Sequence, residues 1–182
     1  MKVNIVFLDA DTVGQTDNLE QFHTLGSYKQ YGLTLPDQVT ERVRGNQIVI
    51  TNKVIIDREV MDECRELKLI CIAATGMNNV DLEHAEKRGI AVRNVAGYST
   101  ESVAQSAFSM LFYLLHSSRY FDNYVKSGEY AESPIFTHHG RSFRELKGMK
   151  FGIIGLGSLL LFNQRKKFEF TIFTGFPRGT PL

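Results

Sequence analysis

The first 155 residues alternate short apolar runs, typical of buried strands, with helical patterns. Strand-like runs occur at residues 3–8, 47–51, 69–74 and 90–93, with a weaker one at 24–28. Helical patterns lie between successive runs, at residues 36–43, 57–64 and 82–87. Because strands that alternate with helices form parallel sheets covered by helices, this order predicts an α/β fold with a doubly wound parallel sheet.

The three helical patterns begin and end at residues that are common at helix termini. Pro36 opens the first pattern, at an early helical position that proline tolerates. Asp57 and Asp81 precede the next two patterns and are predicted N-caps. Gly89 follows the third pattern and is predicted to end that helix.

A longer helix is predicted from Thr100, because apolar residues recur there at three- and four-residue spacings as far as Leu115. A polar connection that contains glycines follows at residues 128–148. The chain then returns to a strand-like run that leads into Gly155.

Composition excludes several classes of function. The net charge of +1 and the 43% apolar content do not point to nucleic acid or to a membrane surface. No apolar run near the N-terminus is long enough for a signal peptide or a membrane span, so a cytoplasmic protein is predicted. Cys64 and Cys71 are predicted to be core or near-core thiols, and the pair His138-His139 to lie in a solvated loop without a metal.

Three segments that follow strands are candidate binding sites. Small residues and Gly76 in segment 73–81 can turn successive N–H groups toward an anion, or can form an ordinary loop capped by Asp81. Segment 94–104 leads into the long helix, where Ser99 or Thr100 can act as N-cap or the helix N-terminus can favour an anion.

The third segment is the turn Gly155-Leu156-Gly157, which follows an apolar strand as in a dinucleotide-binding turn. Position 160, where the third glycine is expected, is Leu160. Residues 158–182 are basic and rich in phenylalanine, and their alternation supports at most one strand, at 168–173. This stretch is interpreted as a foreign tail from a frameshifted or misjoined reading frame.

Three ordered blocks together resemble the D-isomer-specific 2-hydroxyacid dehydrogenases, and within them the glycerate dehydrogenase or hydroxypyruvate reductase type. The blocks are ATGMNNVD at 74–81, RNVAGYSTESVAQSAFSMLFYLL at 93–115 and ELKGMKFGIIGLG at 145–157. The resemblance implies a flavodoxin-like substrate domain at 1–98, a linking helix and connection at 99–149, the start of an NAD-binding Rossmann domain at 150–157 and the non-homologous tail at 158–182.

The resemblance also implies site residues. Thr75 and Gly76 would bind the carboxylate of a small 2-hydroxy or 2-keto acid, and Thr75 would also border NAD or NADP. Val103 would lie beside the nicotinamide, and Gly155 and Gly157 would form the pyrophosphate turn. The parent enzyme is expected to be a homodimer.

The family's catalytic arginine, glutamate and histidine have no counterpart in residues 158–182. The sequence therefore predicts a fragment of an NAD(P)-dependent oxidoreductase that is itself inactive, because hydride transfer to a keto acid needs an acid and a cationic group. The alternative is a catalytically inactive folded module, or an interaction scaffold like the corepressors that share this architecture.

Overall fold

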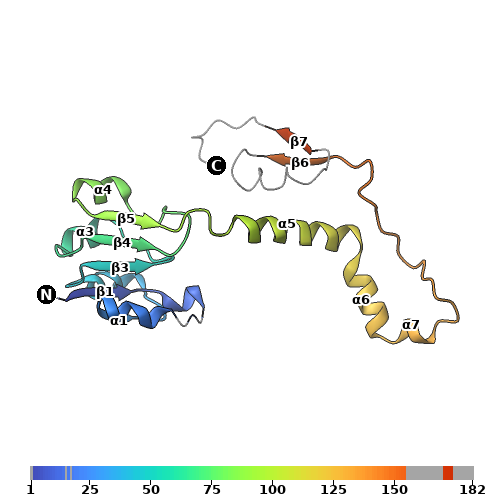
Figure 1. Cartoon of the computed structure of the whole chain (residues 1–182), viewed down its shortest axis with the longest axis horizontal. Coiled ribbons are helices and arrows are strands. Elements are labelled where there is room, and N and C mark those ends of the chain that lie inside the picture. Colours follow the sequence, from blue (N-terminus) through green and yellow to red (C-terminus); the bar gives the residue numbers. More distant parts are fainter. Residues whose placement is uncertain (1, 15, 17, 155–169, 174–182) are drawn as a thin grey trace. The chain divides into compact units, whose positions relative to one another are not determined.

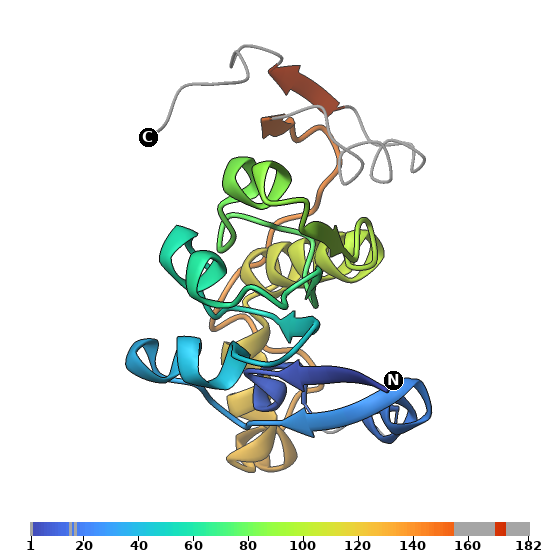
Figure 2. The same cartoon turned by 90° about the vertical axis from the view of Figure 1, so that its left-hand side faces the viewer.

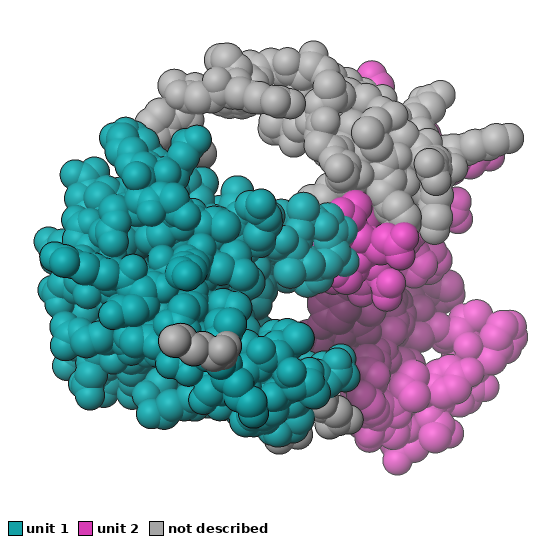
Figure 3. All heavy atoms as spheres, turned by 60° about the vertical axis from the view of Figure 1, so that its left-hand side comes forward, with its two compact units in different colours: residues 1–98 teal, residues 99–182 magenta. Residues whose placement is uncertain are grey.

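The computed structural model of the chain describes residues 2–14, 16, 18–154 and 170–173. These residues fall into two compact units, Met1–Tyr98 and Ser99–Leu182 (Figure 3). Each unit has its own set of strands and helices, so each is treated by itself.

The first unit contains a five-stranded sheet in which every neighbouring pair is parallel. Its strands are β1 (Val3–Phe7), β2 (Gly26–Gln30), β3 (Ile48–Thr51), β4 (Leu69–Ile72) and β5 (Ala91–Asn94). The order is β2-β1-β3-β4-β5, and Figure 1 shows β1, β3, β4 and β5 stacked in this succession. This is the flavodoxin-like doubly wound order, so the predicted fold class is confirmed.

Side chains alternate between the two faces of the sheet, and both faces are covered. Val6 and Leu8 pack into the core beneath α2 (Val39–Val43), α3 (Arg58–Glu63) and α4 (Leu82–Lys87). Ile5 and Phe7 pack into a smaller core with residues of η1 (Ala10–Val13), η2 (Leu19–Gln21) and α1 (Phe22–Leu25). Figure 2 shows α2 and α3, in light blue and teal, on the opposite side of the strands from α1. Because successive strand residues point to opposite faces, nearly continuous apolar runs are what a doubly covered sheet requires.

The predicted helix ends are largely confirmed. The Asp57 side chain accepts a hydrogen bond from the Val60 N–H at 3.0 Å, and Asp81 accepts one from His84 N–H at 2.9 Å. Gly89 follows α4 with a φ of +67°, the left-handed conformation that glycine adopts without strain.

Two predicted elements differ in detail from the structure. The weak strand expected at 24–28 lies at Gly26–Gln30, after the short helix α1, which the sequence did not predict. The pattern at 36–43 begins as the 3₁₀ turn η3 (Pro36–Gln38) and becomes α2 only at Val39.

The second unit begins with the predicted long helix, α5 (Thr100–Leu115). It ends because Ser117 adopts a φ of +53°, and α6 (Ser118–Lys126) and α7 (Glu129–Glu132) follow. These two helices were not predicted as separate elements. Strand β6 (Phe151–Ile154) is the expected run before Gly155, and it pairs in parallel with β7 (Phe170–Phe173).

Candidate anion site at the carboxyl ends of the strands

The carboxyl ends of β1, β3, β4 and β5 lie at one edge of the sheet, where open parallel sheets bind their ligands. Loops 52–57 and 73–81 follow β3 and β4, and Asp9 comes two residues after β1. Hydrogen bonds join these segments to one another.

Asp9 is a buried carboxylate that organises the loop after β3. Only 2% of its surface is exposed. Its Oδ1 accepts a hydrogen bond from Asn52 N–H at 2.8 Å, and its Oδ2 accepts from Lys53 N–H at 2.6 Å and from Val54 N–H at 3.3 Å. A buried carboxylate is costly unless its lone pairs are used, and here backbone donors use them.

The loop after β4 carries the predicted substrate residues Thr75 and Gly76, both exposed. In the chain as far as the structure describes it, no protein group accepts a hydrogen bond from the backbone N–H groups of residues 75–79. A row of successive free N–H groups at a loop is suited to a carboxylate or phosphate. Of the two interpretations of segment 73–81, this arrangement favours the anion site, although Asp81 also caps α4 as expected.

The neighbouring strand β5 holds the start of this loop. The Thr75 hydroxyl donates to the Val95 carbonyl at 3.2 Å, and the Asn94 side-chain amide donates to the Thr75 carbonyl at 2.7 Å. The Val95 N–H donates to the Ala74 carbonyl at 3.1 Å. These bonds occupy the Thr75 side chain and carbonyl and leave its N–H available.

A cavity of about 400 Å³ lies beside the ends of β1 and β3. Most of its wall is apolar, and its lining includes Asp9, Thr12, Thr34, Lys53, Val54 and Ile55. The hydroxyls of Thr12 and Thr34 donate to backbone carbonyls, so they already have acceptors within the protein.

The other predicted site residues belong to the second unit. Val103 is on α5 in the second unit and is 46% exposed. Gly155, Gly157 and Leu160 lie outside the described residues. Ser99 occupies the N-cap position of α5, but its side chain makes no cap hydrogen bond, so that part of the capping prediction is wrong.

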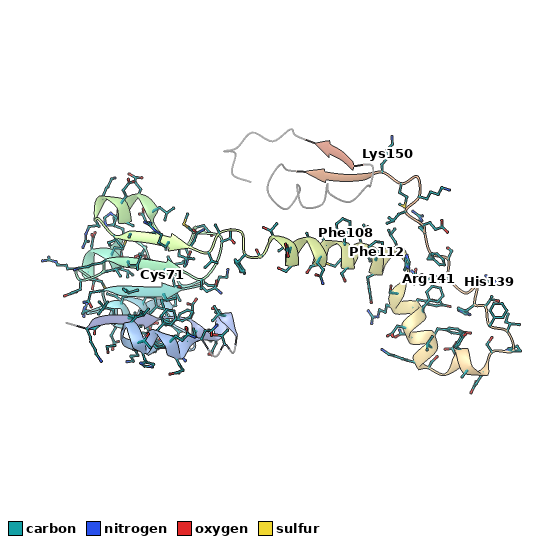
Figure 4. All side chains as sticks on the ribbon, in the orientation of Figure 1. Cys71, Phe108, Phe112, His139, Arg141 and Lys150 are labelled. Atoms are coloured by element: carbon teal, nitrogen blue, oxygen red, sulfur yellow. The ribbon has the colours of Figure 1, made fainter. Side chains whose placement is uncertain are left out.

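The cysteines behave as predicted for core and near-core thiols. Cys64 is buried, and Cys71 lies on β4 within the sheet (Figure 4); neither is in a disulfide. Burial raises the pKa of both thiols, which keeps them protonated near neutral pH.

The loop that contains His138 is not wholly solvated, so that prediction needs correction. The His138 ring stacks on Tyr124 with ring centres 3.7 Å apart, and its Nε2 lies 2.7 Å from the Tyr120 hydroxyl. Both tyrosines project from α6, which therefore anchors the loop, while His139 is exposed. Among the described residues, no group of three or more His, Cys, Asp or Glu side chains could hold a metal ion. In the same part of the chain, no helix is both long and apolar enough to cross a membrane.

Two residues of the site were missed by the sequence analysis. Asp9 and Asn79 bind the loops to each other, but neither was assigned a role, although Asn79 stands in the block at 74–81. The sequence hinted at Asp9 only through its position: it is an acidic residue directly after a buried strand, at the edge of the sheet where ligands bind.

Comparison with known proteins gives a consistent result. The family model described as "D-isomer specific 2-hydroxyacid dehydrogenase, catalytic domain" matches residues 5–168. A Haemophilus influenzae protein, whose name assigns it provisionally to the 2-hydroxyacid dehydrogenases, is 38% identical over 157 residues, which are 86% of this chain and 50% of the relative. Glycerate dehydrogenase from Methylorubrum extorquens is 31% identical over 160 residues, 87% of this chain and 50% of that enzyme.

A solved structure shares the fold. The NADPH-dependent glyoxylate/hydroxypyruvate reductase from Sinorhizobium meliloti, in complex with citrate, superimposes with a TM-score of 0.74 at 22% identity. The match covers 97% of this chain and 56% of that structure. The chain thus spans about half the length of the relatives that it matches.

Proposed function

The chain belongs to the D-isomer-specific 2-hydroxyacid dehydrogenase family, and on this premise we propose that its first unit binds the carboxylate of a small 2-keto or 2-hydroxy acid. In the whole protein this acid exchanges a hydride with NAD or NADP. Two relatives are a glycerate dehydrogenase and a hydroxypyruvate reductase, and this supports a substrate of similar size and polarity to glycerate and hydroxypyruvate.

One observation carries this proposal: the row of free N–H groups at residues 75–79, at the carboxyl end of β4. A small 2-keto acid has one permanent negative charge, and several N–H groups aimed at one point can bind it without a cationic side chain. Thr75 and Gly76 begin this row, and Gly76 has no side chain to cover it.

The cofactor assignment rests on the family. When bound, NAD or NADP would supply or accept the hydride, and Thr75 and Val103 would border it with exposed side chains. Gly155 and Gly157 would hold the pyrophosphate in a turn that follows β6. In this proposal residues 1–98 are the substrate domain, 99–149 the link, 150–157 the start of the cofactor domain and 158–182 a separate tail.

The 182 residues alone are proposed to bind the acid without turning it over. The arginine, the glutamate and the histidine that the family uses have no counterpart in residues 158–182. The complete sheet and the two cores of the first unit support the view that it acts as a folded binding module. The proposed homodimer is that of the whole parent enzyme, and none is proposed for the 182 residues alone.

Titration of the chain with D-glycerate, followed by amide NMR, tests the proposal. We expect the largest shifts at the N–H groups of residues 75–79, with acetamide, an uncharged small molecule, causing none. In Gly76→Val, branched carbons would cover the N–H row, so we expect D-glycerate to bind roughly tenfold more weakly, a loss of about 1.4 kcal/mol.

The matched control is Ala91→Val, which adds bulk at an exposed position near the opposite ends of the strands. It should bind like the unmodified chain. Shifts spread evenly over the sheet, or equal binding by both variants, would contradict the assignment. Oxidation of NADH by the 182 residues with hydroxypyruvate would contradict the proposed lack of turnover.

A further inference from the structure

We propose that Asp9 is a positioning residue for the acid-binding loop, acting through loop 52–54 and the side chain of Asn79. The inference rests on the proposed function, because it concerns how the N–H row of residues 75–79 is held in place. It assigns a role to a buried carboxylate that touches neither the proposed substrate nor the cofactor.

The first part of the path consists of the hydrogen bonds between the Asp9 carboxylate and loop 52–54. Three successive N–H groups, of Asn52, Lys53 and Val54, point at its two carboxylate oxygens. An asparagine in this place would present one amide NH₂ to N–H groups that need an acceptor. The carboxylate accepts from Asn52 and Lys53 with one oxygen each and shares the Val54 N–H with the Thr51 hydroxyl, which lies 3.0 Å from Val54 N, so the conformation of this loop depends on the chemistry as well as on the size of residue 9.

The second step passes from loop 52–54 to the loop after β4. The Val54 carbonyl accepts a hydrogen bond from the Asn79 side-chain amide at 3.0 Å. Two residues further on, Ile56 N–H donates to the Asn79 carbonyl at 2.8 Å, so Asn79 is held by both its side chain and its backbone. The Val54 N–H thus donates to Asp9 and to the Thr51 hydroxyl, and the Val54 carbonyl accepts from the Asn79 side chain.

The third step is the effect on the N–H row. Its first residue, Thr75, is fixed by Asn94 and Val95 at the end of β5. Its last residue, Asn79, is fixed by Val54 of loop 52–54 through its side chain and by Ile56 through its carbonyl. Because the intervening N–H groups have no acceptor among the described residues, these two end points determine where they aim. Release of the Asn79 end would let the donors diverge and would weaken binding of an anion that needs several of them together.

Amide NMR of the chain without ligand gives the first test. In Asp9→Asn we expect shifts of the amide signals of residues 52–54 and also of residues 76–79, which Asp9 does not contact. In Asn79→Ala the amide signals of residues 76–79 should shift, while the amide signal of Lys53, which donates to Asp9, should stay unchanged. Unchanged signals at 76–79 in Asp9→Asn would overturn the proposal.

Binding of D-glycerate gives the second test. We expect Kd to rise roughly tenfold in Asp9→Asn and in Asn79→Ala, the value of about one net hydrogen bond. If Asp9 acts through Asn79, the double variant should bind about as weakly as either single variant. Losses that multiply in the double variant would show two independent effects and would overturn the proposed path.

The control variant is Val43→Ala, which removes buried carbons on α2 without touching either loop. It should lower the free energy of unfolding while leaving Kd and the signals of residues 76–79 unchanged. If the unmodified chain does not bind D-glycerate, the proposed function fails, yet the ligand-free spectra of Asp9→Asn still decide whether Asp9 positions the loop.

Discussion

At the scale of single residues, the caps of α3 and α4 are the most local source of stability. Asp57 accepts the Val60 N–H from outside the helix, which satisfies a donor that has no partner inside α3. Replacing Asp57 with alanine should lower the free energy of unfolding by about 1 kcal/mol. Urea unfolding of Asp57→Ala measures this, and Asp57→Ser, which keeps an acceptor oxygen, should recover most of the loss. Equal losses in the two variants would mean that the cap hydrogen bond is not the cause.

The same scale shows which functional residues can be predicted from sequence. Asp57 and Asp81 were predictable because each caps an N–H three residues ahead. Asp9 was not, because its partners lie 43 to 45 residues along the chain and are backbone groups without a side-chain signature. Thr75 and Gly76 were found through a family motif, whereas the free N–H groups around them appear only in three dimensions.

At the scale of elements, α3 and α4 are joined by an exposed ionic contact. Asp62 on α3 accepts hydrogen bonds at one oxygen from His84 Nε2 at 2.9 Å and from an Arg88 guanidinium N–H at 2.5 Å. These hydrogen bonds hold the pKa of the Asp62 carboxyl below its ordinary value of 3.8. The stabilisation is therefore present above that ordinary value and is lost as the pH falls through the lower pKa of the folded state.

This contact predicts part of the acid sensitivity of the first unit. Thermal unfolding measured from pH 6 down to pH 2 should show a smaller loss of stability below about pH 4 in Asp62→Asn than in the unmodified chain. Glu83→Gln is the control, because the ion pair that Glu83 makes within the described residues is with Lys87 on its own helix. Parallel pH profiles for the unmodified chain and Asp62→Asn would refute the expected link.

The strands β1, β3 and β4 were predictable because they are nearly continuous apolar runs, and α5 was predictable because its apolar period is long. All five strands of the sheet and α5 were predicted with small errors at their ends. Helices α6 and α7 were not predicted. The break between α5 and α6 depends on the left-handed backbone of Ser117, and serine rarely adopts that conformation, so the sequence does not reveal the break. Helix α1 is a single turn and is too short for a helical period to be recognised.

At the scale of the whole molecule, α5 exposes a large apolar surface. Val103, Met110, Tyr113 and Leu114 are exposed and share one face of the helix, while Phe108 and Phe112 lie one turn apart on the other side (Figure 4). Surfaces of this kind cause self-association in water. Light scattering should therefore show concentration-dependent association of the chain.

Replacing Leu114 with glutamate should reduce this association, because Leu114 is 74% exposed on the apolar face of α5. Leu25→Glu is the matched control, since Leu25 is 68% exposed on α1 in the first unit. A monomer at all concentrations before any substitution would show that α5 does not drive association.

The five-stranded sheet also has a consequence for how the protein is made. Every strand pairing of the sheet lies before Val95, and the bond from Val95 N–H to the Ala74 carbonyl completes its edge. Domains fold as units and in N-terminal order during synthesis. The five strands thus need no pairing partner from α5, so the first unit can fold as soon as residue 98 has left the ribosome, without waiting for the apolar helix to follow.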